Sequence, residues 1–222
     1  MSNKPTRTSY SGLTTYETCP LWYKLHYIDG LQRDTSGPAA RRGTRLHLSC
    51  EKFLKGELTK DQLPIEFFKI FNNLEQLLSV KAKAEEEWLV GRDWKIHKEE
   101  QPDTLLKAIV DIHWLSPCKD VLFILDLKTG QQSSSHGDQL QLYAAMGFAR
   151  YPFVDEVSVA PLYLEGEAPP TRYFRENSGG IQQFWKARAL LAIDADSYPP
   201  TPSKEACQWC PYKKAKGGPC EF

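Results

Sequence analysis

Hydrophobic and polar positions repeat at helical spacing through the first ninety residues. A Cys-Pro step interrupts an aromatic-rich stretch near the start, and a proline ends or begins a helix. The pattern therefore predicts two short helices meeting at Cys19-Pro20 between Tyr10 and Gly30, a helix over Ala39–Lys55 and a helix over Asp61–Glu87. A polar loop, Gln32–Pro38, separates the first two helical regions.

After Gly91 the pattern becomes strand-like, and strands and helices then alternate. The segment Val121–Leu127 is hydrophobic almost throughout, which is typical of a buried central strand. The predicted strands are Trp94–Gln101, Leu105–Trp114, Val121–Leu127, Val154–Leu164 and Thr171–Arg175, and the predicted helices are Asp138–Arg150 and Gly180–Ala195. A Gly/Ser/Gln-rich loop, Thr129–Gly137, follows the third strand. This order predicts an α/β fold with a mixed central sheet.

The composition is that of a globular protein whose charge is balanced. The 222 residues include 28 Lys and Arg and 28 Asp and Glu, so the net charge is zero. Binding to nucleic acid would therefore need a local basic surface. With no long apolar run and no apolar targeting region, we expect a soluble cytoplasmic protein without membrane contact. We expect a single domain over 1–222, with a mainly helical part (1–90), an α/β core (91–196) and a cysteine-rich tail (197–222).

Two acidic residues lie at the ends of neighbouring predicted strands. Asp126 and Lys128 share one face of their strand because side chains alternate, and Asp111 lies near the far end of the preceding strand. Carboxylates placed in this way can hold Mg²⁺, and a nearby lysine can position water or stabilise charge on a phosphate. A cross-strand salt bridge is the structural alternative. Asp103 is a competing acid, but it lies in a predicted turn and should not face Asp126.

Four short motifs occur in order around these residues. They are Gly43-x-x-x-His47 on a helix, Asp111 on a strand, Asp126-x-Lys128 on the next strand, and Gln139-x-x-x-Tyr143 on the following helix. Together they resemble the ordered signature of the PD-(D/E)XK nuclease superfamily, specifically its RecB-type branch. The main departure is Ala108, where that family usually has glycine.

The resemblance implies a restriction-endonuclease-like fold, in which helices flank a mixed central sheet. It further implies that His47, Asp111 and Asp126 bind Mg²⁺ or Mn²⁺ and that Lys128 is the catalytic lysine. Gln139 and Tyr143 would contact nucleic acid or orient the metal-bound water. The expected activity is that of a metal-dependent DNA nuclease, an exonuclease, acting on DNA that is single-stranded or has free ends. The expected chemistry is metal-assisted hydrolysis of a phosphodiester bond.

The C-terminal tail contains three cysteines at metal-ligand spacing. Cys207 and Cys210 are separated by two residues, and Gly217-Gly218-Pro219 lets the chain turn back with Cys220. Cys19 is the candidate fourth ligand, because Cys19-Pro20 repeats the Cys210-Pro211 pair.

One early and three late cysteines resemble the iron–sulfur subgroup of RecB-type nucleases, which includes the CRISPR-adaptation relatives and the AddB-type helicase-nucleases. The resemblance implies a 4Fe-4S cluster that joins the N-terminal helices to the tail. Zn²⁺ and unligated thiols remain alternatives. Cys50 and Cys118 are left over as packing residues.

Basic residues precede the candidate metal-binding histidine. Arg41, Arg42 and Arg45 would suit a phosphate backbone, although charge runs are often only solvated faces. Two other functions remain open: a non-catalytic iron–sulfur or zinc DNA-binding accessory subunit, and a salt-bridged structural domain with a zinc staple. Degradation of linear DNA with Mg²⁺ or Mn²⁺, stopped by EDTA, separates the nuclease from both.

Overall fold

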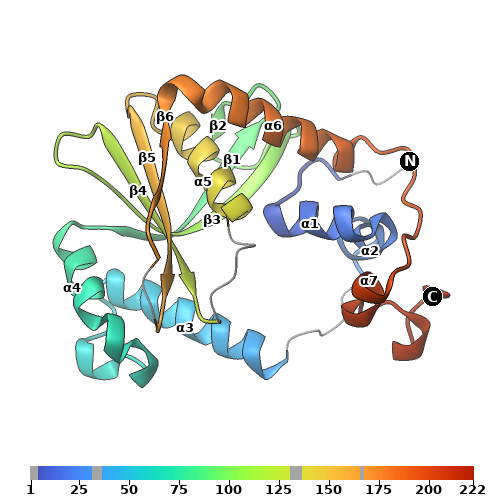
Figure 1. Ribbon diagram of the computed structural model, residues 1–222, viewed down its shortest axis with the longest axis horizontal. Helices are drawn as coiled ribbons and strands as arrows, with labels where there is room; N and C mark the ends of the chain where they lie inside the picture. Colours follow the sequence, from blue (N-terminus) through green and yellow to red (C-terminus); the bar gives the residue numbers. More distant parts are fainter. Residues whose placement is uncertain (1–4, 32–36, 131–136, 166–167) are drawn as a thin grey trace.

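A mixed six-stranded sheet forms the centre of the protein in a computed structural model that describes residues 5–31, 37–130, 137–165 and 168–222. The strand order is β2-β1-β3-β4-β5-β6 (Figure 1). Strands β4 and β5 pair in parallel and the other neighbours are antiparallel. The strands are β1 (Lys83–Gly91), β2 (Ile96–His97), β3 (Thr104–Leu115), β4 (Val121–Lys128), β5 (Glu156–Tyr163) and β6 (Thr171–Phe174). The expected α/β fold with a mixed sheet is confirmed.

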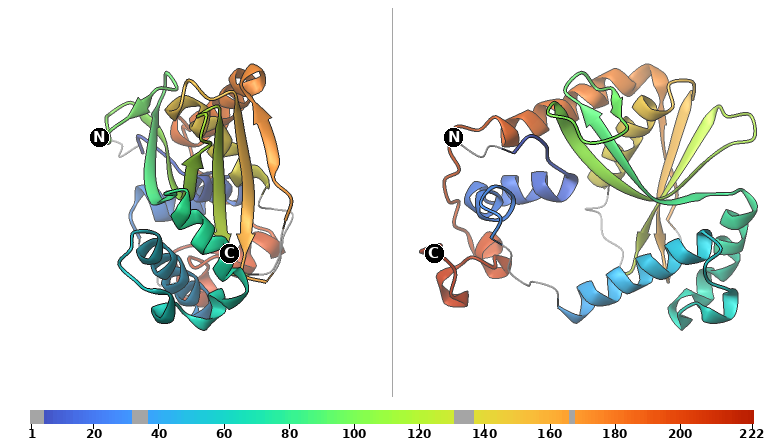
Figure 2. Two further views of the ribbon diagram at one scale, coloured as in Figure 1. Left: turned by 90° about the vertical axis from the view of Figure 1, so that its left-hand side faces the viewer. Right: turned by 180° about the vertical axis from the view of Figure 1, so that it is seen from behind.

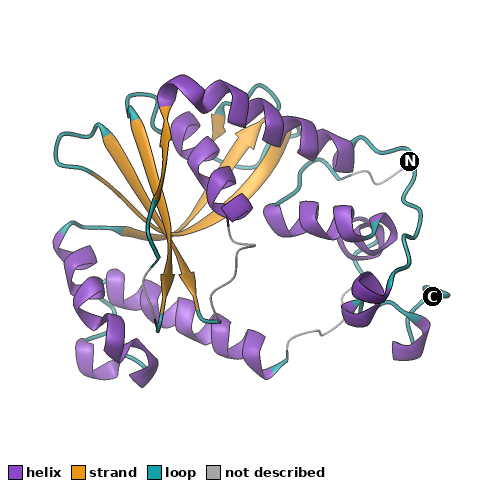
Figure 3. Ribbon diagram, viewed as in Figure 1, coloured by secondary structure: helices purple, strands orange, loops and turns teal. Residues whose placement is uncertain are grey.

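Helices cover both faces of this sheet (Figure 3). The longer ones are α1 (Tyr10–Thr18), α3 (Pro38–Leu54), α4 (Phe71–Ser79), α5 (Gly137–Arg150) and α6 (Arg175–Ile193). Shorter segments are α2 (Pro20–Tyr23), the π-helical η1 (Lys24–Ile28), the 3-10 turns η2 (Lys60–Gln62), η3 (Ile65–Ile70) and η5 (Lys214–Lys216), and α7 (Lys204–Trp209). None of the helices in the described ranges is long and apolar enough to cross a membrane.

A hydrophobic cluster lies on each face of the sheet. The larger cluster joins α5 and α6 to one face, with Leu142 and Trp185 fully buried against strand residues such as Ile124. The smaller cluster joins α3 and α4 to the other face through side chains that include Leu46 and Leu74. Two further views show α3 and α4 lying together, away from α6 (Figure 2). The sheet is therefore the middle layer of three.

The main error of the sequence prediction concerns residues 61–101. The helix expected over Asp61–Glu87 is two 3-10 turns and α4, and its last part is strand β1, which pairs with β3 along most of its length. The strand expected over Trp94–Gln101 shrinks to the two residues of β2. Buried Trp88, Leu89 and Val90 form a strand because both faces of the sheet are covered, and this tertiary burial outweighs the helical tendency of the preceding glutamates.

The remaining predicted elements agree with the structure to within a few residues. Helix α6 is the exception, since it begins at Arg175, five residues before the expected start. The tail also contains structure that its sequence did not predict, namely α7 and η5. The two expected loops, Gln32–Pro38 and Thr129–Gly137, lie largely outside the described residues.

Gly147 allows α5 to approach the sheet closely. A Cβ atom added there would lie 2.7 Å from Cδ2 of the fully buried Leu122. By contrast, a Cβ atom added at Gly179 in α6 would meet nothing within 4 Å.

We predict that Gly147→Val lowers the free energy of unfolding by about 1–3 kcal/mol, the usual cost of overpacking a core. Gly179→Val, the same change in an open helical position, should be neutral or slightly stabilising. Urea unfolding of both variants provides the measurement. Equal stability of the two variants would contradict the close packing of α5 on β4.

Candidate metal centre

Strands β3 and β4 diverge at the point where the candidate site lies. Their ladder runs from the pair Leu115 and Leu122 to the pair Ile112 and Leu125, and the next backbone groups no longer pair. There the buried carboxylate of Asp111 accepts a hydrogen bond from the backbone N–H of Leu127 at 2.7 Å. A side chain thus replaces the lost ladder bond, which satisfies a buried N–H and fixes the Asp111 carboxylate beside β4.

Three potential metal ligands come together from three elements at this divergence. His47 of α3 places Nδ1 3.2 Å from Oε1 of Glu85 on β1 and 3.5 Å from Oδ2 of Asp111 on β3. One ligand atom of each residue lies within 4.8 Å of the others. Gly43, one turn before His47, lets α3 approach the end of β4, because a Cβ atom there would lie 3.2 Å from Oγ1 of Thr129.

The two acids determine the protonation of the histidine. Burial lowers the pKa of His47, but the hydrogen bonds to Asp111 and Glu85 outweigh burial and raise it to about 10. The positive charge of the protonated His47 ring therefore balances the negative charge of the two carboxylates. Glu85 itself has a φ of +50°, a left-handed value that is costly for a residue with a side chain. Such strain is often found at functional sites.

A second group of residues continues from the acids along β4 to α5. Oδ2 of the buried Asp126 lies 2.5 Å from Nζ of Lys128. Nζ of Lys128 also donates to Oε1 of Gln139 at 3.0 Å, and Nε2 of Gln139 donates to the Tyr143 hydroxyl at 2.6 Å. The hydroxyl donates in turn to the carbonyl of Ile109 at 3.1 Å. Asp126 and Gln139 together hold the Lys128 ammonium in one place.

Burial shapes the electrostatics of this group. Desolvation and the neighbouring Asp111 carboxylate raise the pKa of Asp126, and Lys128 partly offsets both effects. Desolvation and the carboxylates of Asp126 and Asp111 raise the pKa of Tyr143 well above its usual value, so the phenol stays protonated and can donate a hydrogen bond. The site therefore brings together the carboxylates of Glu85, Asp111 and Asp126, the last two of them buried, and such a group attracts a cation.

The donor set suits a hard divalent cation. Carboxylate oxygens and one imidazole converge from α3, β1 and β3, and such donors accommodate Mg²⁺ or Mn²⁺. Oδ2 of Asp126 adds a buried carboxylate oxygen whose negative charge is balanced by the Lys128 ammonium. A buried carboxylate needs such a cation beside it, and a metal ion could share this oxygen with Lys128.

Most residues predicted from the motifs lie at this site. The contacts given above connect six of them, namely His47, Asp111, Asp126, Lys128, Gln139 and Tyr143. Asp103, by contrast, lies in an exposed turn before β3, where its Oδ2 is 3.9 Å from Nε2 of His97. Three arginines lie on the same helix as His47. Arg42 donates to the carbonyl of Thr129 at 2.9 Å, both Arg42 and Arg45 pair with Glu66, and Arg41 is exposed.

Glu85 is the site residue that sequence analysis missed. It was placed at the charged end of a helix, whereas it belongs to β1. The available signal was the apolar run Trp88-Leu89-Val90 just before Gly91, which is typical of a strand ending at a turn. Glu85 would then have stood on a strand that can pair beside Asp111.

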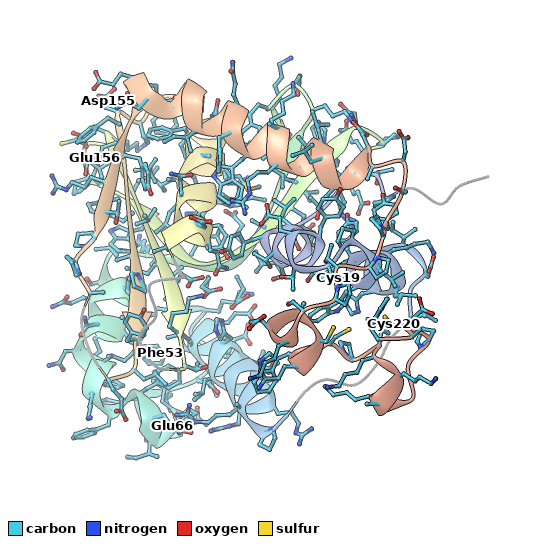
Figure 4. The ribbon with its side chains drawn as sticks, turned by 45° about the vertical axis from the view of Figure 1, so that its right-hand side comes forward. Cys19, Phe53, Glu66, Asp155, Glu156 and Cys220 are labelled. Atoms are coloured by element: carbon cyan, nitrogen blue, oxygen red, sulfur yellow. The ribbon has the colours of Figure 1, made fainter. Side chains whose placement is uncertain are left out.

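The four candidate cysteines lie in a different part of the molecule. Burial raises the pKa of the Cys210 thiol, and the neighbouring thiols of Cys19, Cys220 and Cys207 raise it further. Figure 4 shows Cys19 and Cys220 on the same side of the molecule, between the N-terminal helices and the tail. Cys50 is buried in the smaller cluster and Cys118 is exposed in a turn.

The tail packs against the N-terminal helices through a small apolar cluster. Tyr212, Cys210 and Leu25 are buried together. Nδ1 of His26 lies 2.9 Å from the Tyr212 hydroxyl, and the backbone N–H of Cys220 donates to the carbonyl of Tyr212 at 3.0 Å. Gly218 permits this return of the chain, because a Cβ atom there would lie 1.9 Å from the Tyr212 carbonyl oxygen.

Acids that can hold a divalent cation, with a lysine beside them, suit metal-assisted chemistry on a phosphate. The sequence profile of the PD-(D/E)XK nuclease superfamily matches residues 7–215. The chain therefore belongs to the PD-(D/E)XK nuclease superfamily.

Two solved structures resemble the fold at low sequence identity. One is the crystal structure of SSO0001, with 17% identity and a TM-score of 0.48 over 93% of this chain and 84% of that chain. The other is a candidate exonuclease from Eubacterium rectale, with 12% identity and a TM-score of 0.47 over 94% of this chain and 86% of that chain. No curated protein sequence matches this chain.

We predict that Glu85→Gln weakens Mn²⁺ binding about tenfold or more, since the variant removes a charged oxygen donor from the centre. In the metal-free protein the variant should also lower the pKa of His47, because the hydrogen bond to Glu85 raises it. Calorimetric titration with Mn²⁺ and an NMR titration of the histidine provide the two measurements.

Glu87→Gln is the matched control, because Glu87 lies on the same strand but pairs with Lys107. It should bind Mn²⁺ as the unmodified protein does. Equal Mn²⁺ affinity of the Glu85 and Glu87 variants would remove Glu85 from the centre.

Proposed function

We propose that the protein is a Mg²⁺- or Mn²⁺-dependent deoxyribonuclease of the RecB type that acts as an exonuclease. The observation that carries this proposal is the approach of His47, Glu85 and Asp111 beside the chain of contacts from Asp126 through Lys128 to Gln139. Family membership supports nuclease chemistry on DNA. The order of the four motifs supports the RecB type, to which the exonuclease assignment belongs.

In this proposal His47, Glu85, Asp111 and Asp126 hold the metal ion. When bound, the ion would polarise the scissile phosphate and lower the pKa of a water molecule. Its binding requires His47 to give up the proton shared with Asp111 and Glu85, so the imidazole becomes a neutral donor. The remaining steps depend on side chains of the protein.

Lys128 positions the attacking water and stabilises charge on the phosphate. Its ammonium carries three N–H groups, and among the described residues Asp126 and Gln139 engage two of them. The third can point at the reacting oxygen. Gln139 presents its carbonyl to Lys128 because Tyr143 occupies its amide nitrogen. Gln139 and Tyr143 thus orient the lysine, and a fixed cation aimed at developing charge is an effective form of catalysis.

Single substitutions at the ion pair test this assignment. We predict that Asp126→Ala and Lys128→Ala each lower cleavage of linear DNA about 100-fold or more while the protein remains folded. Degradation of labelled linear and closed circular DNA with Mg²⁺ or Mn²⁺, and with EDTA as control, measures both activity and the need for an end. Wild-type rates in either variant would reject the catalytic role, and cutting of circular DNA would reject the exonuclease.

Asp111 on β3 and Asp103 in the turn before β3 provide a matched pair of substitutions. Asp111→Asn should remove activity and weaken metal binding, because Asp111 contacts both His47 and the backbone of Leu127. Asp103→Asn should be nearly silent, because Asp103 is exposed and remote from the acids. Metal-titrated kinetics of both variants check this difference. DNA binding without any cleavage by the unmodified protein would favour the non-catalytic accessory subunit.

The four cysteines form the second part of the proposal. We infer that Cys19, Cys207, Cys210 and Cys220 bind one 4Fe-4S cluster, with Zn²⁺ as the alternative, and that its role is structural. The thiols of Cys19, Cys207 and Cys220 lie close enough to Cys210 to raise the pKa of its thiol, and this proximity supports a common site. The tail is held by few other apolar contacts, and ligation would close a loop of nearly the whole chain. Thiolates suit soft metals, so this site is separate from the oxygen-rich centre.

Protein purified without oxygen should be brown and should contain iron and acid-labile sulfide. Cys19→Ala, Cys207→Ala, Cys210→Ala and Cys220→Ala should each lower the melting temperature more than Cys118→Ala, whose thiol is exposed in a turn. Colourless protein that contains one zinc ion would show that the four cysteines bind zinc in place of the cluster. Equal melting temperatures for the Cys19 and Cys118 variants would remove Cys19 from the site.

A further inference from the structure

The separation of β3 from β4 leaves one edge of β3 without a neighbouring strand of the main sheet. The N-terminal segment covers part of this edge, since Thr8 forms a parallel bridge with Leu106. The backbone N–H of Thr8 donates to the carbonyl of Leu105 at 3.0 Å, and the N–H of Lys107 donates to the carbonyl of Thr8 at 2.9 Å. Beyond Lys107 the segment turns into α1, so a space remains between β3, α1 and α5.

This space is a pocket of about 410 Å³ whose lining includes Gln139, the residue that accepts a hydrogen bond from Lys128. Its wall includes Ile109 of β3, Arg7 and Tyr10 of the N-terminal segment and helix, and Tyr27 of η1. Gln139 and Tyr143, which orient Lys128, form the wall nearest the site. The volume falls within the range of about 300–1,000 Å³ that small-ligand pockets occupy. An occupant would therefore lie beside the two residues that orient Lys128.

The lining combines apolar surface with positive charge. Ile109 is 46% exposed and Tyr27 is 40% exposed, so both offer apolar surface to the pocket. Arg7 and Lys107 lie at the same pocket and pair with the carboxylates of Glu100 and Glu87 at the surface. Surface ion pairs are weak, so a phosphate can replace either carboxylate. An aromatic surface with nearby cations suits a nucleobase and its phosphate.

We propose that this pocket binds one unpaired nucleotide of the DNA strand next to the scissile phosphate, with its base against Tyr27 and Ile109 and its phosphate on Lys107 and Arg7. The inference rests on the proposed nuclease activity and extends it to the form of the substrate. A base that remains paired cannot enter a pocket at the edge of a sheet, so the strand must be single or frayed at the cut. Ala108 also lines the pocket.

Binding measured without cleavage tests the pocket independently of the chemistry. The full-length protein is titrated in EDTA against a fluorescent single-stranded oligonucleotide at several salt concentrations. Lys107→Ala should weaken binding and reduce the slope of log K against log salt by about 0.7, the value for one phosphate contact with a single strand. Tyr27→Ala should weaken binding about tenfold through loss of stacking.

Two matched variants control for charge and aromatic area. Lys95→Ala removes an exposed lysine that pairs with Asp93, away from the pocket, and Phe153→Ala removes an exposed aromatic ring after α5. Both should bind as the unmodified protein does. If Tyr27→Ala fails to fold, the salt slope of Lys107→Ala alone decides. Pocket variants indistinguishable from their controls would overturn the proposal.

Substrates that lack one base provide the second arm. Removal of the base at one position near the cut should slow single-turnover cleavage by the unmodified protein, and the Tyr27→Ala variant should no longer discriminate between the two substrates. Equal cleavage of all base-deleted strands by the unmodified protein would overturn the pocket while leaving the nuclease intact. Absence of all cleavage with Mg²⁺ or Mn²⁺ would overturn the proposed function, and the binding data would still judge the pocket.

Discussion

The hydrogen bond from the backbone of Leu127 to the carboxylate of Asp111 is the contact on which the rest of the site depends. It lies where the β3–β4 ladder ends, and it lets the two strands separate without leaving a buried N–H unpaired. Asp111 therefore has two roles, since it stabilises the fork and faces the metal centre. The same separation brings Asp126 and Lys128 to the open side of β4 and leaves the edge of β3 exposed to the pocket.

Charge balance explains why each acid in the site has a basic neighbour. Two carboxylates buried side by side are unfavourable, and here His47 lies between Asp111 and Glu85 while Lys128 lies against Asp126. In the metal-free protein the His47 proton supplies the positive charge that a divalent ion would otherwise bring. The fold can thus form without a metal ion, and a metal ion that bound to His47 would have to displace this proton. Gln139 and Asp126 hold the Lys128 ammonium in place.

The parts of the site that follow local rules could be predicted from the sequence. Alternation along a strand placed Asp126 and Lys128 together, and the four-residue spacing placed Gln139 and Tyr143 in contact. Glu85 is harder to find in this way, because a run of three glutamates has no strand period and only the apolar run that follows it indicates a strand. The pocket was equally inaccessible, since it depends on a parallel bridge between Thr8 and Leu106, almost one hundred residues apart. Long-range pairing of this kind leaves no periodic trace in a single sequence.

The packing of the C-terminal tail bears on the site through η1. The tail residue Tyr212 bonds to His26 and packs with Leu25, and the ring of the adjacent Tyr27 lies 4.6 Å from that of His26. Tyr27 also contacts Tyr23, which is fully buried in the main core. The segment that carries one wall of the pocket is therefore held between the core and the tail. Whatever fixes the tail therefore also holds that wall of the pocket in place, although the tail lies far from the acids.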